Sequence, residues 1–113
     1  MVNLLELSTA RPPHKLSQEE AFRFILKMDP KDASAEANLG ELAVARGDLR
    51  AAIPHFEAAV SLKPANPGLI ALLLDAAISA REKDLVVKTF ARLKEVAPLY
   101  PRIGDFEERI RRM

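Results

Sequence analysis

Apolar residues recur at steps of three and four along most of the chain, which is the spacing of one helix face and not the alternation of a half-buried strand. Leu39, Leu42 and Ala43 follow this spacing, and a Gly47-Asp48 dipeptide then interrupts it. The spacing resumes at Ala52, Ile53, Phe56, Ala59 and Val60. Two amphipathic helices joined by a glycine-containing turn form a helical hairpin. The pattern therefore predicts an all-α chain and offers no clear strand.

Several residues recur with a fixed period of 34. They are Phe22, Phe56 and Phe90 and, in the same register, Pro30, Pro64 and Pro98. Leu39 with Leu73 and Ala43 with Ala77 share the same offset. A constant period of this length is typical of helical repeat architectures, in which each unit buries its apolar face against the next. The chain is therefore predicted to stack helical hairpins.

Side chains that favour helix ends stand at the borders of these predicted helices. Asp48 can accept a hydrogen bond from a free backbone amide at the start of a helix. Pro64 is expected to end that helix, because the residue before a proline avoids helical geometry. Asn66 followed by Pro67 then predicts a new helix beginning at Pro67, where the missing proline N–H costs nothing.

Two further helix starts are predicted, one from a capping box and one where the sequence departs from the repeat. Ser17 with Glu20 forms a capping-box pattern. In the second period Arg81 stands where Gly47 stood in the first, and Asp84 is a better cap than the residue that replaces Asp48. We therefore expect the second turn to differ from the first and its helix to be capped by Asp84.

The residues at these positions resemble the tetratricopeptide repeat family, whose unit of about 34 residues is a helix-turn-helix. The matching positions are Leu39, Gly40, Gly47, Asp48, Ala52, Phe56, Ala59 and Pro64 in one full repeat, and Leu73, Ala77, Phe90 and Pro98 in a looser second repeat. The resemblance implies a short right-handed superhelical stack of antiparallel helix pairs with a C-terminal capping helix.

A length of 113 residues, with 49% apolar residues, fits one folded domain. Its predicted parts are a partial N-terminal repeat at 1–32, repeats at 33–66 and 67–100, and a capping helix at 101–113. The capping helix carries one apolar face, made of Ile103, Phe106, Ile110 and Met113. Its arginines Arg109, Arg111 and Arg112 are expected to point outward.

Charge and composition exclude several function classes. Lys and Arg total 17 against 16 Asp and Glu, so the chain has no strong attraction for nucleic acid. Its apolar runs are too short to span a bilayer, so membrane insertion is not expected. There is no cysteine and no recognisable secretion signal, which fits a cytoplasmic protein.

Catalytic and metal-binding chemistry has little support in the sequence. His14 falls in a predicted loop, and His55 is interpreted as a solvated surface histidine rather than a ligand or base. Glu41 and Asp75 could form an acid and base pair or bind a cation, but a solvated acidic face is favoured because no further oxygen ligands cluster nearby. We therefore predict no enzyme activity, no metal and no cofactor.

The family resemblance implies a function in protein–protein interaction, with the first helix of each pair lining a concave groove. The groove residues implied here are Ala37, Asn38, Glu41, Ala45, Ala71, Leu72, Asp75 and Ser79. One subtype of the family grips the terminal carboxylate of chaperone tails. Asn38 matches that clamp, but Gly68 and Leu72 replace its basic residues, so this ligand is disfavoured.

The expected partner is a protein or peptide, held as an adaptor or scaffold would hold it. A mixed apolar and acidic groove suits an amphipathic helix or a basic, partly apolar segment. A homodimer that buries the open edges of the stack is a further expected partner. The alternative function is a docking or regulatory segment of a larger protein, which could be an enzyme, and nucleic-acid binding is a third hypothesis.

Overall fold

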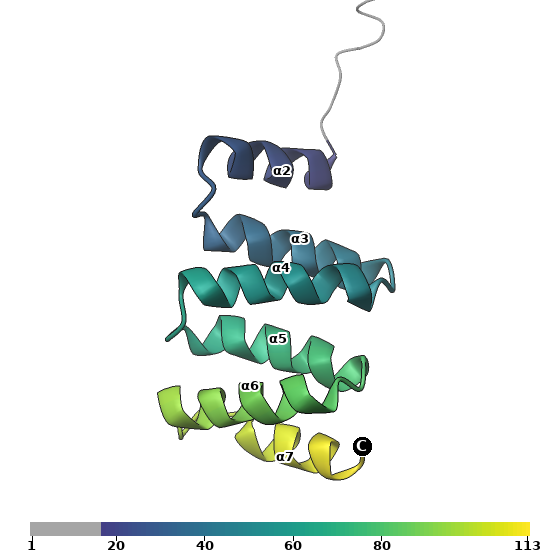
Figure 1. Ribbon diagram of the computed structural model, residues 1–113, viewed down its shortest axis with the longest axis vertical. Coiled ribbons are helices and arrows are strands. Elements are labelled where there is room, and N and C mark those ends of the chain that lie inside the picture. Colours follow the sequence, from purple (N-terminus) through teal and green to yellow (C-terminus); the bar gives the residue numbers. More distant parts are fainter. Residues whose placement is uncertain (1–16) are drawn as a thin grey trace, which may run out of the picture.

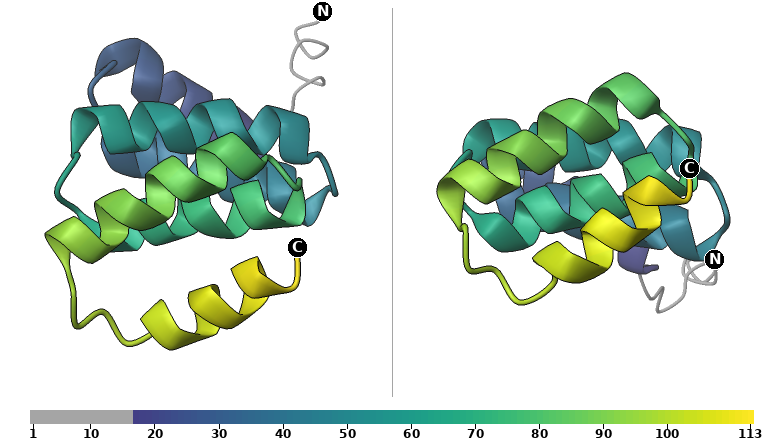
Figure 2. Two further views of the ribbon diagram at one scale, coloured as in Figure 1. Left: turned by 60° about the horizontal axis from the view of Figure 1, so that its bottom comes forward. Right: turned by 90° about the horizontal axis from the view of Figure 1, so that it is seen from below.

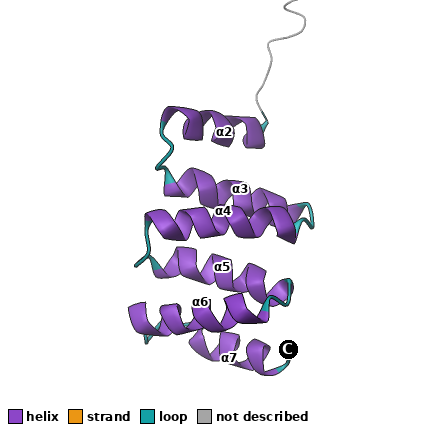
Figure 3. Ribbon diagram, viewed as in Figure 1, coloured by secondary structure: helices purple, strands orange, loops and turns teal. Residues whose placement is uncertain are grey.

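Helices are the regular structure of residues 17–113, the part of the chain that the computed structural model describes. They are α2 (Gln18–Met28), α3 (Ala33–Ala45), α4 (Leu49–Leu62), α5 (Pro67–Ser79), α6 (Lys83–Val96) and α7 (Ile103–Arg111) (Figure 1). Within these residues there is no strand, which confirms the predicted fold class (Figure 3). The first half of the predicted partial repeat, with His14, lies outside the described residues.

Three predicted helix starts are confirmed by hydrogen bonds. The Asp48 carboxylate accepts from the Ala51 amide at 3.1 Å, and the Asn66 side chain accepts from the Leu69 amide at 3.2 Å. The capping box at Ser17 forms both of its reciprocal bonds. Because each cap satisfies a backbone amide that has no partner inside its helix, these residues fix where the helices begin.

The turn before α6 corrects the prediction for the second period. Arg81 has a φ of 58°, close to the 80° of Gly47, and the following amide in each turn donates to the carbonyl five residues back, at 3.0 Å and 2.9 Å. Helix α6 begins at Lys83 after Glu82, so Asp84 lies inside the first turn and is not the cap. The repeat packing therefore imposes one backbone turn on both sequences, even where no glycine is present.

Replacing Arg81 by glycine is expected to raise the free energy of unfolding by about 0.5–1 kcal/mol, because a residue with a Cβ is strained in the left-handed region. Urea denaturation monitored by circular dichroism measures the change. The matched control is Gly47→Ala, which should lower stability by a similar amount, since a Cβ there meets nothing within 4 Å and only the backbone is affected. An Arg81→Gly protein of lower stability than the parent would contradict this reading of the turn.

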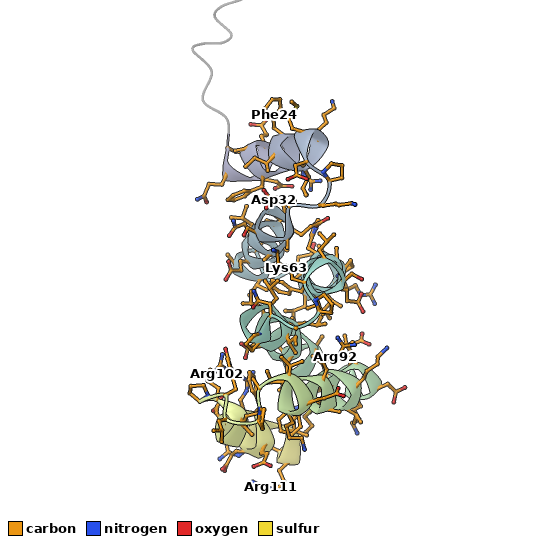
Figure 4. All side chains as sticks on the ribbon, turned by 90° about the vertical axis from the view of Figure 1, so that its left-hand side faces the viewer. Phe24, Asp32, Lys63, Arg92, Arg102 and Arg111 are labelled. Carbon is orange, nitrogen blue, oxygen red and sulfur yellow. The ribbon has the colours of Figure 1, made fainter. Side chains whose placement is uncertain are left out.

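The helices form two layers. Helices α3, α5 and α7 lie along one side of the stack, whereas α4 and α6 lie along the other (Figure 4). The layers meet closely at Gly40, where an added Cβ would come within 2.6 Å of the Phe56 ring. Such a contact requires glycine, so the Leu39-Gly40 pair of the repeat signature serves to bring α3 against α4.

The residues of the repeat signature occupy the positions expected from the period. Those buried in the structure are Leu39, Gly40, Ala52, Phe56, Ala59, Leu73 and Ala77. Phe90 is only partly buried. Pro64 and Pro98 are exposed and follow the ends of α4 and α6. The apolar positions that repeat every 34 residues are therefore mostly those whose side chains pack against a neighbouring helix.

Helix α7 covers the C-terminal end of the stack, as predicted. Phe106 is fully buried in a cluster with residues of α5 and α6, and Ile103, Ile110 and Met113 pack around it. Figure 2 shows α7 lying across this end. A short amphipathic helix with its apolar side turned inward gives the stack a polar outer surface here.

Candidate functional site

A hollow of about 450 Å³ opens on the side of the stack formed by the first helix of each pair. Its walls come from α3 and α5, with contributions from α4 and α7. The lining residues are Glu41, Val44, Ala45, Leu49, Phe56, Leu72, Asp75, Ala76, Ser79 and Arg109. Consecutive hairpins leave this space because their first helices are held apart by the second helix that connects them.

Five of the predicted groove residues line this hollow together, namely Glu41, Ala45, Leu72, Asp75 and Ser79. Ala45 and Ser79 are exposed and occupy equivalent positions of α3 and α5. These five residues therefore lie together on one side of the stack, and their role in binding a partner stays a prediction.

The remaining three predicted residues do not line the hollow. Ala37 and Ala71 are 6% and 3% exposed, so the expectation that they face a partner is wrong. Ala37 packs with Ala59, and Ala71 packs in the cluster that contains Phe106. Small side chains at these positions allow close helix packing instead of leaving room for a ligand. Asn38 is half-buried on α3 outside the hollow.

Three residues of equivalent register surround the hollow. Glu41, Asp75 and Arg109 are spaced by one period each, and all three lie in its wall. The cap predicted at 101–113 is present, but the expectation that Arg109 points outward is wrong, because its side chain lies in the wall of the hollow. The same period that aligned the first two repeats would have placed Arg109 here, because α7 stands where the first helix of a further repeat begins.

Asp75 is held by two arginines from the C-terminal segment. It accepts two hydrogen bonds from Arg102, at 3.0 and 3.1 Å, and one from Arg109 at 2.6 Å. The hydrogen bond to Asp75 raises the pKa of the Arg102 guanidinium above its usual value, so the guanidinium stays charged. The acidic groove predicted from Glu41 and Asp75 is therefore neutralised at Asp75, whereas Glu41 makes no ion pair within residues 17–113.

The Phe106 ring lies beneath the two arginines that bind Asp75. The guanidinium carbons of Arg102 and Arg109 lie 4.6 and 5.7 Å from the centre of the Phe106 ring. A cation over an aromatic face is stabilised by the ring quadrupole. Phe106 therefore links the buried end of the stack to the charged rim of the hollow.

Replacing Asp75 by asparagine is expected to lower the free energy of unfolding by about 1 kcal/mol, since two partly exposed ion pairs are each worth a few tenths to 1 kcal/mol. Backbone amides of α7 should exchange faster with deuterium, because the arginines then lose the carboxylate that fixes them. The control is Glu41→Gln, which should change neither quantity. Unaltered exchange in α7 would show that the ion pairs contribute nothing to its docking.

His55 is not the free surface histidine that the sequence suggested. Its Nδ1 lies 2.9 Å from Oε1 of Glu36, and only 27% of the His55 side chain is exposed. The pair connects α4 to α3. In residues 17–113 no three side chains among His, Cys, Asp and Glu gather as a metal site would need, and no helix there has the length and apolar character to cross a membrane.

A comparison with known protein families gives a match over the second half of the chain and beyond. The family model described as tetratricopeptide repeat matches residues 43–110, which is more than half of the chain. The match runs from the end of α3 to α7 and so includes every lining residue of the hollow except Glu41, together with Arg102 and Arg109. A search of the curated proteins gives no match.

Proposed function

The chain belongs to the tetratricopeptide repeat family, whose members generally act as protein–protein interaction modules, and from that premise we propose that it binds a peptide or helix of a partner protein in the hollow between α3 and α5. The role is that of an adaptor or scaffold, without catalysis and without a cofactor. The observation that carries the proposal is that accessible apolar side chains and the Glu41 carboxylate, which makes no ion pair within residues 17–113, line one concave site.

The chemistry of the hollow defines the class of partner. Val44 is 43% exposed and lies beside Ala45, so the wall offers apolar contact area to an inserted side chain. Glu41 is exposed at the same wall. An apolar anchor neighboured by a lysine or arginine fits both features, because the cation can pair with Glu41 while the anchor is desolvated.

Net charge and cysteine content bear on the class of partner and on the cellular compartment. The nearly balanced charge of the chain gives nucleic acid no electrostatic advantage, and the absence of cysteine suits a reducing cytoplasm. A docking or regulatory segment of a larger protein, including an enzyme, would use the same hollow. The adaptor and the docking segment would therefore bind a partner with the same residues. They would differ only in whether the module is part of a larger polypeptide.

Site-specific photo-cross-linking in cells tests the proposal and does not require the partner to be identified first. A photoreactive amino acid at Ala45 or Ser79 should yield a discrete cross-linked protein. The same group at Arg50 or Asp84 on the outer side should not. Cross-links from the outer positions alone would refute binding in the hollow.

A further inference from the structure

A second hollow, of about 330 Å³, opens on the side of the stack formed by α4 and α6, and we call it the outer hollow. Its walls come from the second half of α4 and the middle of α6, and its floor comes from α5. It shares no lining residue with the hollow between α3 and α5, so the two spaces are separate. A space of this size suits a small molecule or a single side chain.

The floor of the outer hollow is apolar. Ile70 and Leu73 of α5 line it and are 0% and 5% exposed. Val60 of α4 and Leu85 of α6 are half-buried at its sides. A short hydrocarbon group that entered the hollow would leave water and contact these side chains, which is favourable.

A buried hydroxyl group lies in the wall of this apolar space. Thr89 of α6 lines the outer hollow and is only 5% exposed. Within residues 17–113 its side chain takes part in no hydrogen bond. Buried hydroxyl groups are normally hydrogen-bonded, because burial removes the water that would otherwise pair with them. The outer hollow therefore contains a donor that a bound molecule could satisfy.

Two cations stand at the rim, next to Thr89 in the sequence. Lys88 and Arg92 both line the outer hollow, are exposed, and are four residues apart on one face of α6. Arg92 donates one hydrogen bond to the Pro64 carbonyl at 3.2 Å, and neither cation forms an ion pair within residues 17–113. Figure 4 shows Arg92 on the side of α6 nearest to α4. The remaining guanidinium N–H groups and the Lys88 ammonium are free to bind an anion.

One carboxylate also lines the outer hollow and limits the charge of a ligand. Glu57 precedes Ser61 by one turn on the same face of α4, so it lies farther from the Pro64 end where Arg92 binds. With Lys88, Arg92 and Glu57 the lining carries a net charge of one positive unit. An anion would therefore bind at the Arg92 end, and a single negative charge is matched better than two.

We propose that the outer hollow binds a carboxylate carried on a short apolar body. The carboxylate accepts a hydrogen bond from the Thr89 hydroxyl and pairs with Lys88 and Arg92, and the apolar body covers the floor at Ile70 and Leu73. An arginine fork and a carboxylate match in geometry as well as in charge. The site is independent of the proposed partner site, because the two hollows have no residue in common.

Titration of the full chain with matched probes, followed by nuclear magnetic resonance, tests the chemistry. Hexanoate should shift the amide signals of Lys88 and Thr89 and saturate them at about millimolar concentration, since a ligand with so few atoms binds weakly. Hexanamide has the same shape without the charge, and acetate has the charge without the apolar body. Each should bind at least about tenfold more weakly than hexanoate.

Three variants of α6 test the named side chains. Lys88→Gln and Arg92→Gln should each weaken hexanoate binding by about fivefold or more. Thr89→Val should weaken it similarly without lowering the melting temperature, because valine keeps the packing and removes a hydroxyl that has no partner in the fold. The matched control is Lys94→Gln, which removes another cation of α6 that lies over the Phe90 ring and outside the outer hollow, and it should leave binding unchanged.

A second probe distinguishes the source of the carboxylate. A leucyl-aspartate dipeptide blocked at both ends presents an acidic side chain beside an apolar one, as a polypeptide would, whereas hexanoate represents a free acid. The tighter of the two identifies the natural class of ligand. The proposal would be overturned if neither probe bound, if hexanoate and hexanamide bound equally, or if hexanoate bound the Thr89→Val, Lys88→Gln and Arg92→Gln proteins as well as the parent.

Discussion

The Phe56→Ala protein is expected to be less stable than the parent by about 3–5 kcal/mol, the usual cost of emptying a large aromatic side chain from a core. Phe56 is 2% exposed and packs in a cluster with Ala43, Ala52 and Leu73, which belong to both full repeats. The ring also fills the space that Gly40 leaves on α3. Its small neighbours cannot expand into the cavity, so little of the lost contact is recovered.

Chemical denaturation gives this difference directly, and Phe90 provides the comparison. Phe90 stands one period after Phe56 but is only partly buried, and the Lys94 ammonium lies 4.5 Å above its ring. Phe90→Ala should therefore cost clearly less than Phe56→Ala. A loss below about 1 kcal/mol for Phe56→Ala would mean that Phe56 does not hold the repeats together.

The second large effect concerns binding. In the Val44→Arg, Ser79→Arg double variant, affinity for a partner bound in the hollow is expected to fall by about a hundredfold or more. The variant removes apolar contact at one wall, and its new cations compete for Glu41 and repel the lysine or arginine expected in the partner, which together should cost several kcal/mol of binding free energy.

The same double variant should fold almost normally. Val44 and Ser79 are exposed and lie in the last turns of α3 and α5, where a positive charge interacts favourably with the helix dipole. The change in unfolding free energy should therefore stay within about 0.5 kcal/mol. Leu72 is less suitable for this purpose, because it is half-buried and packs against two core clusters.

Local sequence signals predicted the fold because they act over a few residues. Asp48 and Asn66 cap the helices that follow them, and the period identified Phe56 and Leu73 as core residues. The second turn was predicted wrongly because residue preference was weighed without the packing around it. Arg81 adopts the conformation of Gly47 since the two hairpins must close in the same way.

The candidate site was predicted less completely, because its details depend on contacts between distant residues. Ala37 and Ala71 share the helix face nearest the groove, but neighbouring helices bury them. The pairing of Asp75 with Arg102 and Arg109 spans about one repeat and has no local pattern. Only the shared register of Asp75 and Arg109 carried a usable signal in the sequence.

Calorimetric titration of the partner captured by cross-linking from Ala45 tests the central claim most directly. The partner should bind the parent chain and the Val87→Arg control with affinities within about twofold of each other, and it should bind the Val44→Arg, Ser79→Arg variant about a hundredfold more weakly. Full affinity of the double variant, together with loss of binding by the Val87→Arg protein, would contradict the account and place the interaction on the outer helices.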